Sequence, residues 1–137
     1  MLEPTKLILR AEKVAQNAYA PYSRFPVGSC LVSAGGAVYD GVNVENASFG
    51  GTICAERMAL GCAVTAEGPS LRIVQVIVHT TASPPAVPCG LCLQVLAEFC
   101  APDTLVVCGN HRGEVRNFRF SELLPQAFQG SEMPSRD

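Results

Sequence analysis

Seven cysteines in a chain of 137 residues limit both the folds and the compartments open to this protein. They are Cys30, Cys54, Cys62, Cys89, Cys92, Cys100 and Cys108. An odd number of thiols cannot pair completely within one chain, and residues 1–13 are charged and amphipathic, unlike a secretory signal peptide. We therefore expect a cytoplasmic protein whose reduced thiols either bind a metal ion or pack as small apolar side chains.

Length and composition indicate a single domain over residues 1–137, with residues 130–137 as a flexible tail. Hydrophobic residues make up 48% of the chain and charged residues 16%, against a usual charged share of about 25%. The mean hydropathy of +0.23 suggests more apolar surface than one small domain buries. We therefore expect the protein to form oligomers.

The charge pattern argues against two classes of partner. The net charge is −2 and no cluster of Lys and Arg suits a phosphate backbone, so nucleic acid is not expected. No apolar run approaches the roughly 20 residues that span a bilayer, so a membrane is not expected either.

Hydrophobic periodicity predicts four helices and five strands. The predicted helices cover residues 4–20, 54–67, 89–101 and 121–124, and the predicted strands cover 27–34, 37–44, 71–79, 104–108 and 115–120. Gly35-Gly36 between the first two strands is typical of an antiparallel hairpin, and the apolar 71–79 run suits a central strand. This alternation favours a layered α/β sandwich of about five strands.

Two short segments place cysteines where helices are predicted to begin: residues 54–57 (Cys-Ala-Glu-Arg) and 88–92 (Pro-Cys-Gly-Leu-Cys). A helix N-terminus lowers the pKa of a nearby thiol and so favours the thiolate that a metal needs. Three thiolates fill three corners of a zinc tetrahedron, and a water molecule can occupy the fourth. Glu56 would lie beside that water.

Zn²⁺ with three thiolates carries a formal charge of −1, which makes it a weaker Lewis acid than zinc held by three neutral imidazoles. We expect Arg57 and the helix N-termini to compensate by stabilising the thiolates, and Glu56 to take a proton from the water.

Further segments share an order and spacing with a known family. Residues 21–28 (Pro-Tyr-Ser-Arg-Phe-Pro-Val-Gly), 43–47 (Asn-Val-Glu-Asn-Ala) and 122–125 (Glu-Leu-Leu-Pro), with the two cysteine segments, resemble the small homotetrameric zinc-dependent cytidine deaminases. The resemblance covers nearly the whole chain. It implies an α-β-α layered sandwich with a mixed five-stranded sheet, and one zinc ion in each subunit of a cytoplasmic homotetramer. The implied reaction is hydrolysis of cytidine and 2′-deoxycytidine to uridine and 2′-deoxyuridine plus ammonia, in pyrimidine salvage.

The resemblance also implies roles for the cysteine segments. Cys54, Cys89 and Cys92 would bind zinc, and a zinc-activated water would attack C4 of the pyrimidine. Glu56 would carry protons to N3 and then to the departing amino group.

Substrate contacts are implied for six residues, which are Phe25, Asn43, Glu45, Ala55, Val87 and Phe128. The two phenylalanines would pack on the base, the main chain of Ala55 would meet the base edge, and the Val87 carbonyl would meet the amino group. Asn43 and Glu45 would bind the ribose, and a carboxylate there favours free nucleosides because it repels phosphate. Ala47 and Phe49 lie in a loop that reaches a neighbouring subunit's site in this family.

Three positions depart from the family pattern. Leu93 stands where Arg is common, which removes a positive charge near the zinc ligands, and Phe49-Gly50 stands where Tyr-Pro is common, which removes a hydroxyl. Leu91 replaces a small Ala, a change we expect to be tolerated.

Two other interpretations remain open from the sequence. A deaminase of a cytosine nucleoside analogue such as blasticidin S would share the zinc segments, although Phe25, Asn43 and Glu45 favour cytidine. A structural zinc module would complete the tetrahedron with a fourth thiol, such as Cys62 or Cys100. We otherwise expect the four remaining cysteines, Cys30, Cys62, Cys100 and Cys108, to be buried small hydrophobes.

Overall fold

The computed structural model describes residues 1–134, and its helices and strands follow the predicted order. The helices are α1 (Pro4–Ala15), α2 (Ala55–Glu67), α3 (Gly90–Leu96) and α4 (Phe120–Leu123), with 3-10 turns at η1 (Phe49–Gly51) and η2 (Gly130–Glu132). The strands are β1 (Gly28–Ser33), β2 (Val38–Val42), β3 (Ile73–Thr80), β4 (Cys100–Asn110) and β5 (Val115–Arg119). None of the helices within this described part is both long and apolar enough to cross a bilayer.

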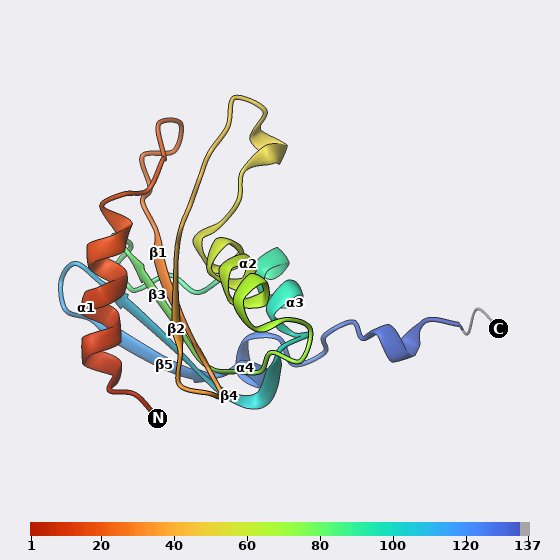
Figure 1. The fold of residues 1–137 in the computed structure, drawn as a ribbon. Coiled ribbons are helices and arrows are strands. Elements are labelled where there is room, and N and C mark those ends of the chain that lie inside the picture. The colour runs from red at the N-terminus through yellow and green to blue at the C-terminus, as the bar shows by residue number, and fades with distance from the viewer. Residues whose placement is uncertain (135–137) are drawn as a thin grey trace.

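The five strands form one mixed sheet in the order β2-β1-β3-β4-β5 (Figure 1). The β1–β2, β1–β3 and β4–β5 pairs are antiparallel, and β3 pairs with β4 in parallel. The central position predicted for the 71–79 run is confirmed by β3. Because β3 and β4 are parallel, the chain must cross over between them, and α3 lies in that crossover.

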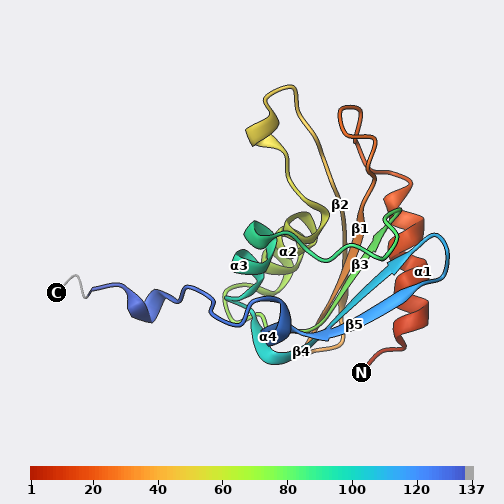
Figure 2. The ribbon, with the colours of Figure 1, turned by 180° about the vertical axis from the view of Figure 1, so that it is seen from behind.

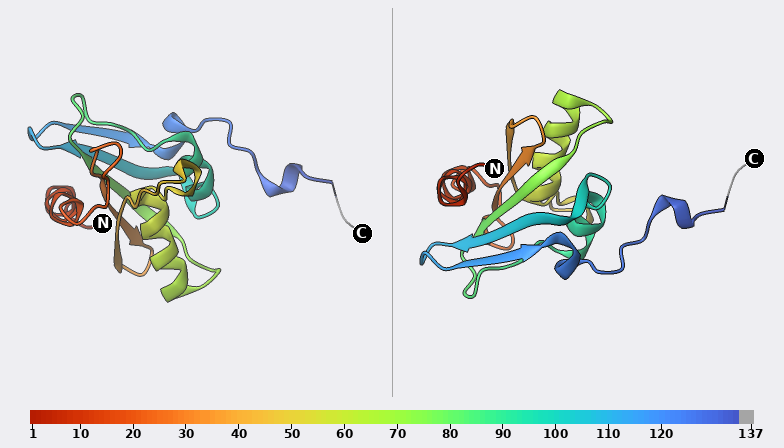
Figure 3. Two further views of the ribbon diagram at one scale, coloured as in Figure 1. Left: turned by 90° about the horizontal axis from the view of Figure 1, so that it is seen from above. Right: turned by 90° about the horizontal axis from the view of Figure 1, so that it is seen from below.

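Helices cover both faces of the sheet, which gives three layers (Figures 2 and 3). Helix α1 covers one face, where Leu7 and Ala11 pack on Cys30, Ile77 and Val107. Helices α2, α3 and α4 cover the other face, and alternate strand residues point toward them. The core on that side comprises Leu31, Ala59, Leu60, Ala63, Leu71, Ile73, Val76, Val78, Leu93, Leu96, Val106, Cys108 and Phe120. The predicted α-β-α sandwich with a mixed five-stranded sheet is confirmed.

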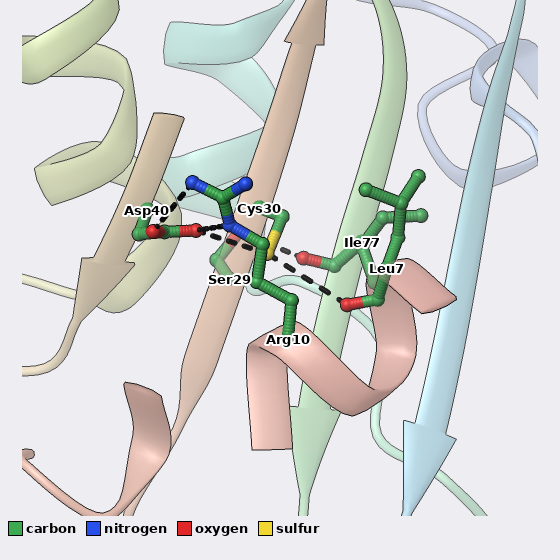
Figure 4. A network of polar contacts seen from close by, with 6 residues as sticks. All are labelled: Leu7, Arg10, Ser29, Cys30, Asp40 and Ile77. Atoms are coloured by element: carbon green, nitrogen blue, oxygen red, sulfur yellow. Dashed lines mark hydrogen bonds and ion pairs between the residues drawn. The ribbon is translucent and has the colours of Figure 1, made fainter. Parts of the chain in front are cut away.

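A polar network fastens α1 to the sheet (Figure 4). Arg10 Nε and Nη2 donate to the two carboxylate oxygens of Asp40, at 2.8 and 2.9 Å, and the Cys30 thiol donates to the same carboxylate at 3.3 Å. In the same region, the Ser29 hydroxyl donates to the Ile77 carbonyl at 2.8 Å. Burial, together with the Asp40 carboxylate, raises the pKa of the Cys30 thiol to about 12, so Cys30 stays neutral.

Two helices are shorter at their C-terminal ends than predicted, because the residues that follow them pair with strands. Helix α1 stops at Ala15 rather than residue 20, because Tyr19 exchanges main-chain hydrogen bonds with Asn43 and Glu45. Helix α3 stops at Leu96 rather than residue 101, because the chain enters β4 at Cys100. Strand pairing outweighs a local helical pattern in both places.

The cysteines outside the two motif segments are buried to different degrees. Cys30 and Cys108 are fully buried, as predicted, and Cys100 is partly buried. The prediction is wrong for Cys62, which is exposed because it faces away from the sheet, whereas Ala59 and Ala63 of the same helix pack inward. The predicted flexible tail begins with η2, and its last residues, 135–137, lie outside the described residues.

Gly41 allows α2 to lie against the β2 edge of the sheet. A Cβ at this position would collide with the carbonyl oxygen of Ala55 and the main-chain nitrogen of Ala59. We expect Gly41→Ala to lower the free energy of unfolding by about 1–3 kcal/mol, because the first turn of α2 would have to shift. Urea denaturation followed by circular dichroism measures this change.

Gly35→Ala is the matched control, because a Cβ there meets nothing closer than the Ser33 hydroxyl oxygen at 3.8 Å. Equal stability of the two variants would contradict the close approach of α2 to β2.

Candidate active site

Three cysteine thiols meet where α2 and α3 begin. Cys54 and Cys89 are the capping residues that precede the two helices, and Cys92 lies in the first turn of α3. Their sulfur atoms all lie within 4.8 Å of one another, and those of Cys89 and Cys92 are 3.5 Å apart. Tetrahedral zinc with Zn–S bonds of about 2.3 Å separates its sulfurs by about 3.8 Å, so this cluster fits one zinc ion.

Within residues 1–134, no fourth Cys, His, Asp or Glu ligand atom joins this cluster. Neither Cys62 nor Cys100 is a member, so the described part of the chain does not form the saturated four-sulfur site of a structural zinc module. Three protein ligands with an open fourth position are the pattern of a catalytic zinc site.

Arg57 lies beside the cluster and supplies positive charge. Its Nη2 donates to Cys54 Sγ at 3.6 Å and to the Thr52 carbonyl at 3.3 Å. Burial raises the pKa of the Cys92 thiol, the Glu56 carboxylate raises it further, and Arg57 opposes both effects. A bound metal cation would hold Cys92 as a thiolate despite its burial.

Glu56 follows Cys54 in the first turn of α2, and its side chain is only 4% exposed. Burial raises the pKa of this carboxyl, although the Glu56 main chain and Arg57 act in the opposite direction. Its protonated form is therefore more accessible than that of an exposed glutamate, which suits a group that takes up and releases a proton.

A cavity of about 240 Å³ lies beside the cysteine cluster. Its walls come from five segments of the chain: Ser23, Phe25, Val27, Asn43, Glu45, Thr52, Cys54, Ala55, Glu56, Val78, Thr80, Ala86, Val87 and Cys89. The fold therefore brings five of the six predicted substrate residues to the same cavity as Glu56 and two of the cysteines.

Asn43 and Glu45 hold the loop that carries Phe25. Asn43 Oδ1 accepts from the Val27 main chain and Asn43 Nδ2 donates to the Phe25 carbonyl, both at 2.9 Å. Asn43 and Glu45 are each at least nine-tenths buried. The sequence pattern did not indicate that they also hold this loop in place.

The Glu45 carboxylate accepts three hydrogen bonds from the preceding turn. The donors are the main-chain N–H groups of Tyr22 and Ser23, at 2.9 and 3.0 Å, and the Ser23 hydroxyl. The Ser23 hydroxyl and main-chain bonds lower the pKa of Glu45, with a further contribution from Tyr22, so this carboxylate stays charged. Sequence reasoning missed Ser23, whose place within the 21–28 segment was its only signal.

Three predicted contact residues lie outside the cavity. Phe128 is 56% exposed and does not line the cavity that Phe25 lines, and its carbonyl accepts a hydrogen bond from Gln94 Nε2 at 2.8 Å. Phe49 is 73% exposed and packs edge-to-face on Tyr22, with ring centroids 5.6 Å apart. Ala47 is exposed in the same loop.

The two unusual leucines of the second cysteine segment lie in different surroundings. Leu93 is buried in the core between α3 and the sheet, whereas Leu91 is 59% exposed. Leu93 therefore adds packing and no charge to this helix, and positive charge beside Cys54 comes from Arg57.

Comparisons with known proteins agree with this geometry. A family model described as the cytidine and deoxycytidylate deaminase zinc-binding region matches residues 1–108. The cytidine deaminase of Halalkalibacterium halodurans is 44% identical over 127 residues, covering 93% of this chain and 95% of the relative. That of Sporosarcina psychrophila is 38% identical over 132 residues and covers 96% of each chain.

Solved structures show the same similarity. A cytidine deaminase structure from Burkholderia pseudomallei has a TM-score of 0.87 at 42% identity, covering 93% of this chain and all of that chain. One from Mycobacterium tuberculosis has a TM-score of 0.79 at 34% identity, covering 94% and 99%.

We expect one zinc ion per chain in the purified protein, coordinated by three sulfurs and one lighter atom. Cys92→Ser should lower the zinc-to-protein ratio well below one, because the loss of one of three thiolates removes a strong ligand. Elemental analysis gives the ratio, and X-ray absorption at the zinc edge counts the sulfurs.

Cys62→Ser is the matched control, since Cys62 is exposed and outside the cluster. A zinc ion surrounded by four sulfurs, or full zinc content in Cys92→Ser, would contradict this site.

Proposed function

The chain belongs to the cytidine deaminase family, and on that basis we propose that Glu56 carries the protons while cytidine is hydrolysed to uridine and ammonia. One observation supports this role above the others. The buried Glu56 carboxylate lines the same cavity as Cys54 and Cys89, two members of the cysteine cluster.

The reaction consumes one water molecule and replaces the amino group at C4 of the pyrimidine with oxygen. Cys54, Cys89 and Cys92 would hold a zinc ion, which would act as a Lewis acid and make a water molecule more acidic. Glu56 accepts one proton of that water and gives it to N3 of the ring. It then takes the second proton from the hydroxyl now attached to C4 and transfers it to the amino group, which leaves as ammonia while the C4 oxygen becomes a carbonyl.

Three residues are proposed to orient the base. Phe25 packs against the ring, the main chain of Ala55 binds the ring edge, and the Val87 carbonyl accepts a hydrogen bond from the amino group. All three line the cavity that contains Glu56. Orientation of this kind lowers the entropic part of the barrier.

Asn43 and Glu45 are proposed to bind the ribose. The charged Glu45 carboxylate is a strong acceptor for a sugar hydroxyl and repels a phosphate group. We therefore infer that nucleosides, including 2′-deoxycytidine, are preferred over nucleotides, which suits an enzyme of pyrimidine salvage.

A homotetramer is also proposed. Phe49, Phe128 and a hollow along α2 that includes Met58 and Cys62 leave apolar surface uncovered on the single chain. Contact with neighbouring subunits would cover such surface and would account for Ala47 and Phe49 as contacts to a neighbouring site.

The metal ligands are free thiols, which supports a reducing compartment such as the cytoplasm.

Glu56→Gln tests the proton-transfer role. The amide is close in size to the carboxylate but cannot carry the proton, so we expect kcat for cytidine to fall by a factor of about 10²–10⁴ with zinc retained. The loss of cytidine absorbance in the ultraviolet gives the rate.

Glu67→Gln is the matched control, because it makes the same exchange at the exposed other end of α2. Full activity of zinc-loaded Glu56→Gln would exclude the role assigned to Glu56, and inactivity of the wild type on cytidine would exclude the substrate.

The tetramer is tested by sedimentation equilibrium at micromolar concentration. We expect a mass near four times the 14.5 kDa of one chain. A mass near that of one chain would exclude it.

A further inference from the structure

The loop of residues 81–88 links β3 to α3 and forms one wall of the cavity. It carries Ala86 and Val87, and it ends at the metal ligand Cys89. Within residues 1–134, residues 82–88 make no main-chain to main-chain hydrogen bond, and prolines at 84, 85 and 88 lack an N–H donor altogether. The position of this wall therefore depends on side chains from other elements.

Asn110 at the end of β4 supplies the central contact and is only 2% exposed. Its Nδ2 donates to the Ala82 carbonyl at 2.8 Å and to Glu114 Oε1 at 3.0 Å. Its Oδ1 accepts from the main-chain N–H groups of Arg112 and Glu114, both at 3.0 Å. The amide thus has two functions, since Oδ1 shapes the β4–β5 turn and Nδ2 faces the loop.

Two neighbours of Asn110 hold the next residues of the loop. Glu114 Oε1 accepts from the Ser83 hydroxyl at 2.6 Å, and Arg116 Nη1 donates to the Pro85 carbonyl at 3.1 Å. The Pro85 side chain is fully buried. Figure 2 shows the loop leaving β3 beside the β4–β5 turn before it crosses to α3.

We propose that Asn110 is a positioning residue for deamination, which holds the 81–88 loop through Ala82 and Glu114 so that the Val87 carbonyl meets the departing amino group. The proposal rests on the function proposed above, in particular on the role of Val87. Glu114 and Arg116 assist by fixing Ser83 and Pro85. The hairpin that supports the loop contributes no residue to the cavity wall itself.

Asn110→Asp separates the two functions of the amide. Aspartate keeps an acceptor oxygen for the turn but has no N–H to donate to Ala82. We expect kcat of the zinc-loaded enzyme on cytidine to fall about tenfold, because small displacements of an orienting group are costly to the rate. Since uridine has no amino group, we expect its inhibition constant to stay within about twofold of wild type.

The double variant Asn110→Asp/Glu114→Gln removes the repulsion between two carboxylates but still lacks a donor for Ala82. It should remain as slow as the single variant, and recovery of the wild-type rate would overturn the proposal.

Ser83→Ala is a second variant at an exposed position, where folding is not at risk. It should lower kcat on cytidine without changing the inhibition constant of uridine. Ser70→Ala, at an exposed position in the turn that precedes β3, is its control.

The outcomes separate this proposal from the function on which it rests. A wild-type enzyme that does not deaminate cytidine would refute the proposed function itself. If the wild type is active and Asn110→Asp has the same kcat and KM, only the role of Asn110 is overturned. Loss of zinc from Asn110→Asp would also overturn the role of Asn110, and so would an equal loss of affinity for uridine and for cytidine. Either result would mean that the substitution disrupts the whole site.

Discussion

The meeting of two helix starts on one face of the sheet is the constraint on which the site depends. Cys54 precedes α2, and Cys89 and Cys92 lie at the start of α3, so a shift of either helix would separate the sulfurs. The parallel β3–β4 pair requires a crossover, which places α3 on this face, and Gly41 lets α2 approach β2. Backbone packing therefore sets the geometry of the metal ligands.

The cavity walls, by contrast, are loops held by buried polar side chains. Glu45 and Asn43 hold the loop that carries Phe25, and Asn110 holds the loop that carries Val87. Buried hydrogen-bonded networks of this kind specify one arrangement, because an unpaired partner would be costly to bury. In the proposed mechanism, the metal ligands, Ala55 and Glu56 lie at rigid helix starts, while the contacts made by Phe25 and Val87 depend on these networks.

Much of this arrangement was predictable from local signals. Hydrophobic periodicity indicated nine elements in the right order, and the cysteine spacing with Glu56 indicated the zinc site. Helix ends were harder to predict, because Tyr19 and Cys100 enter strand-like pairing despite a helical pattern. The exposure of Cys62 was also missed, since a helical stripe does not say which of its members face the sheet.

The sequence by itself determined the order of elements, the three thiol ligands and the acid that accompanies them, because each is a short-range pattern of residue types. Only the tertiary structure decided that Ser23 would donate a hydrogen bond to Glu45. The same is true of the hydrogen bond from Asn110 to Ala82, which lies 28 residues earlier in the chain. It also left Phe128 outside the cavity of its own chain. Such contacts join residues that are distant in sequence, and no local pattern encodes them, because they arise only when the sheet brings its strand ends together.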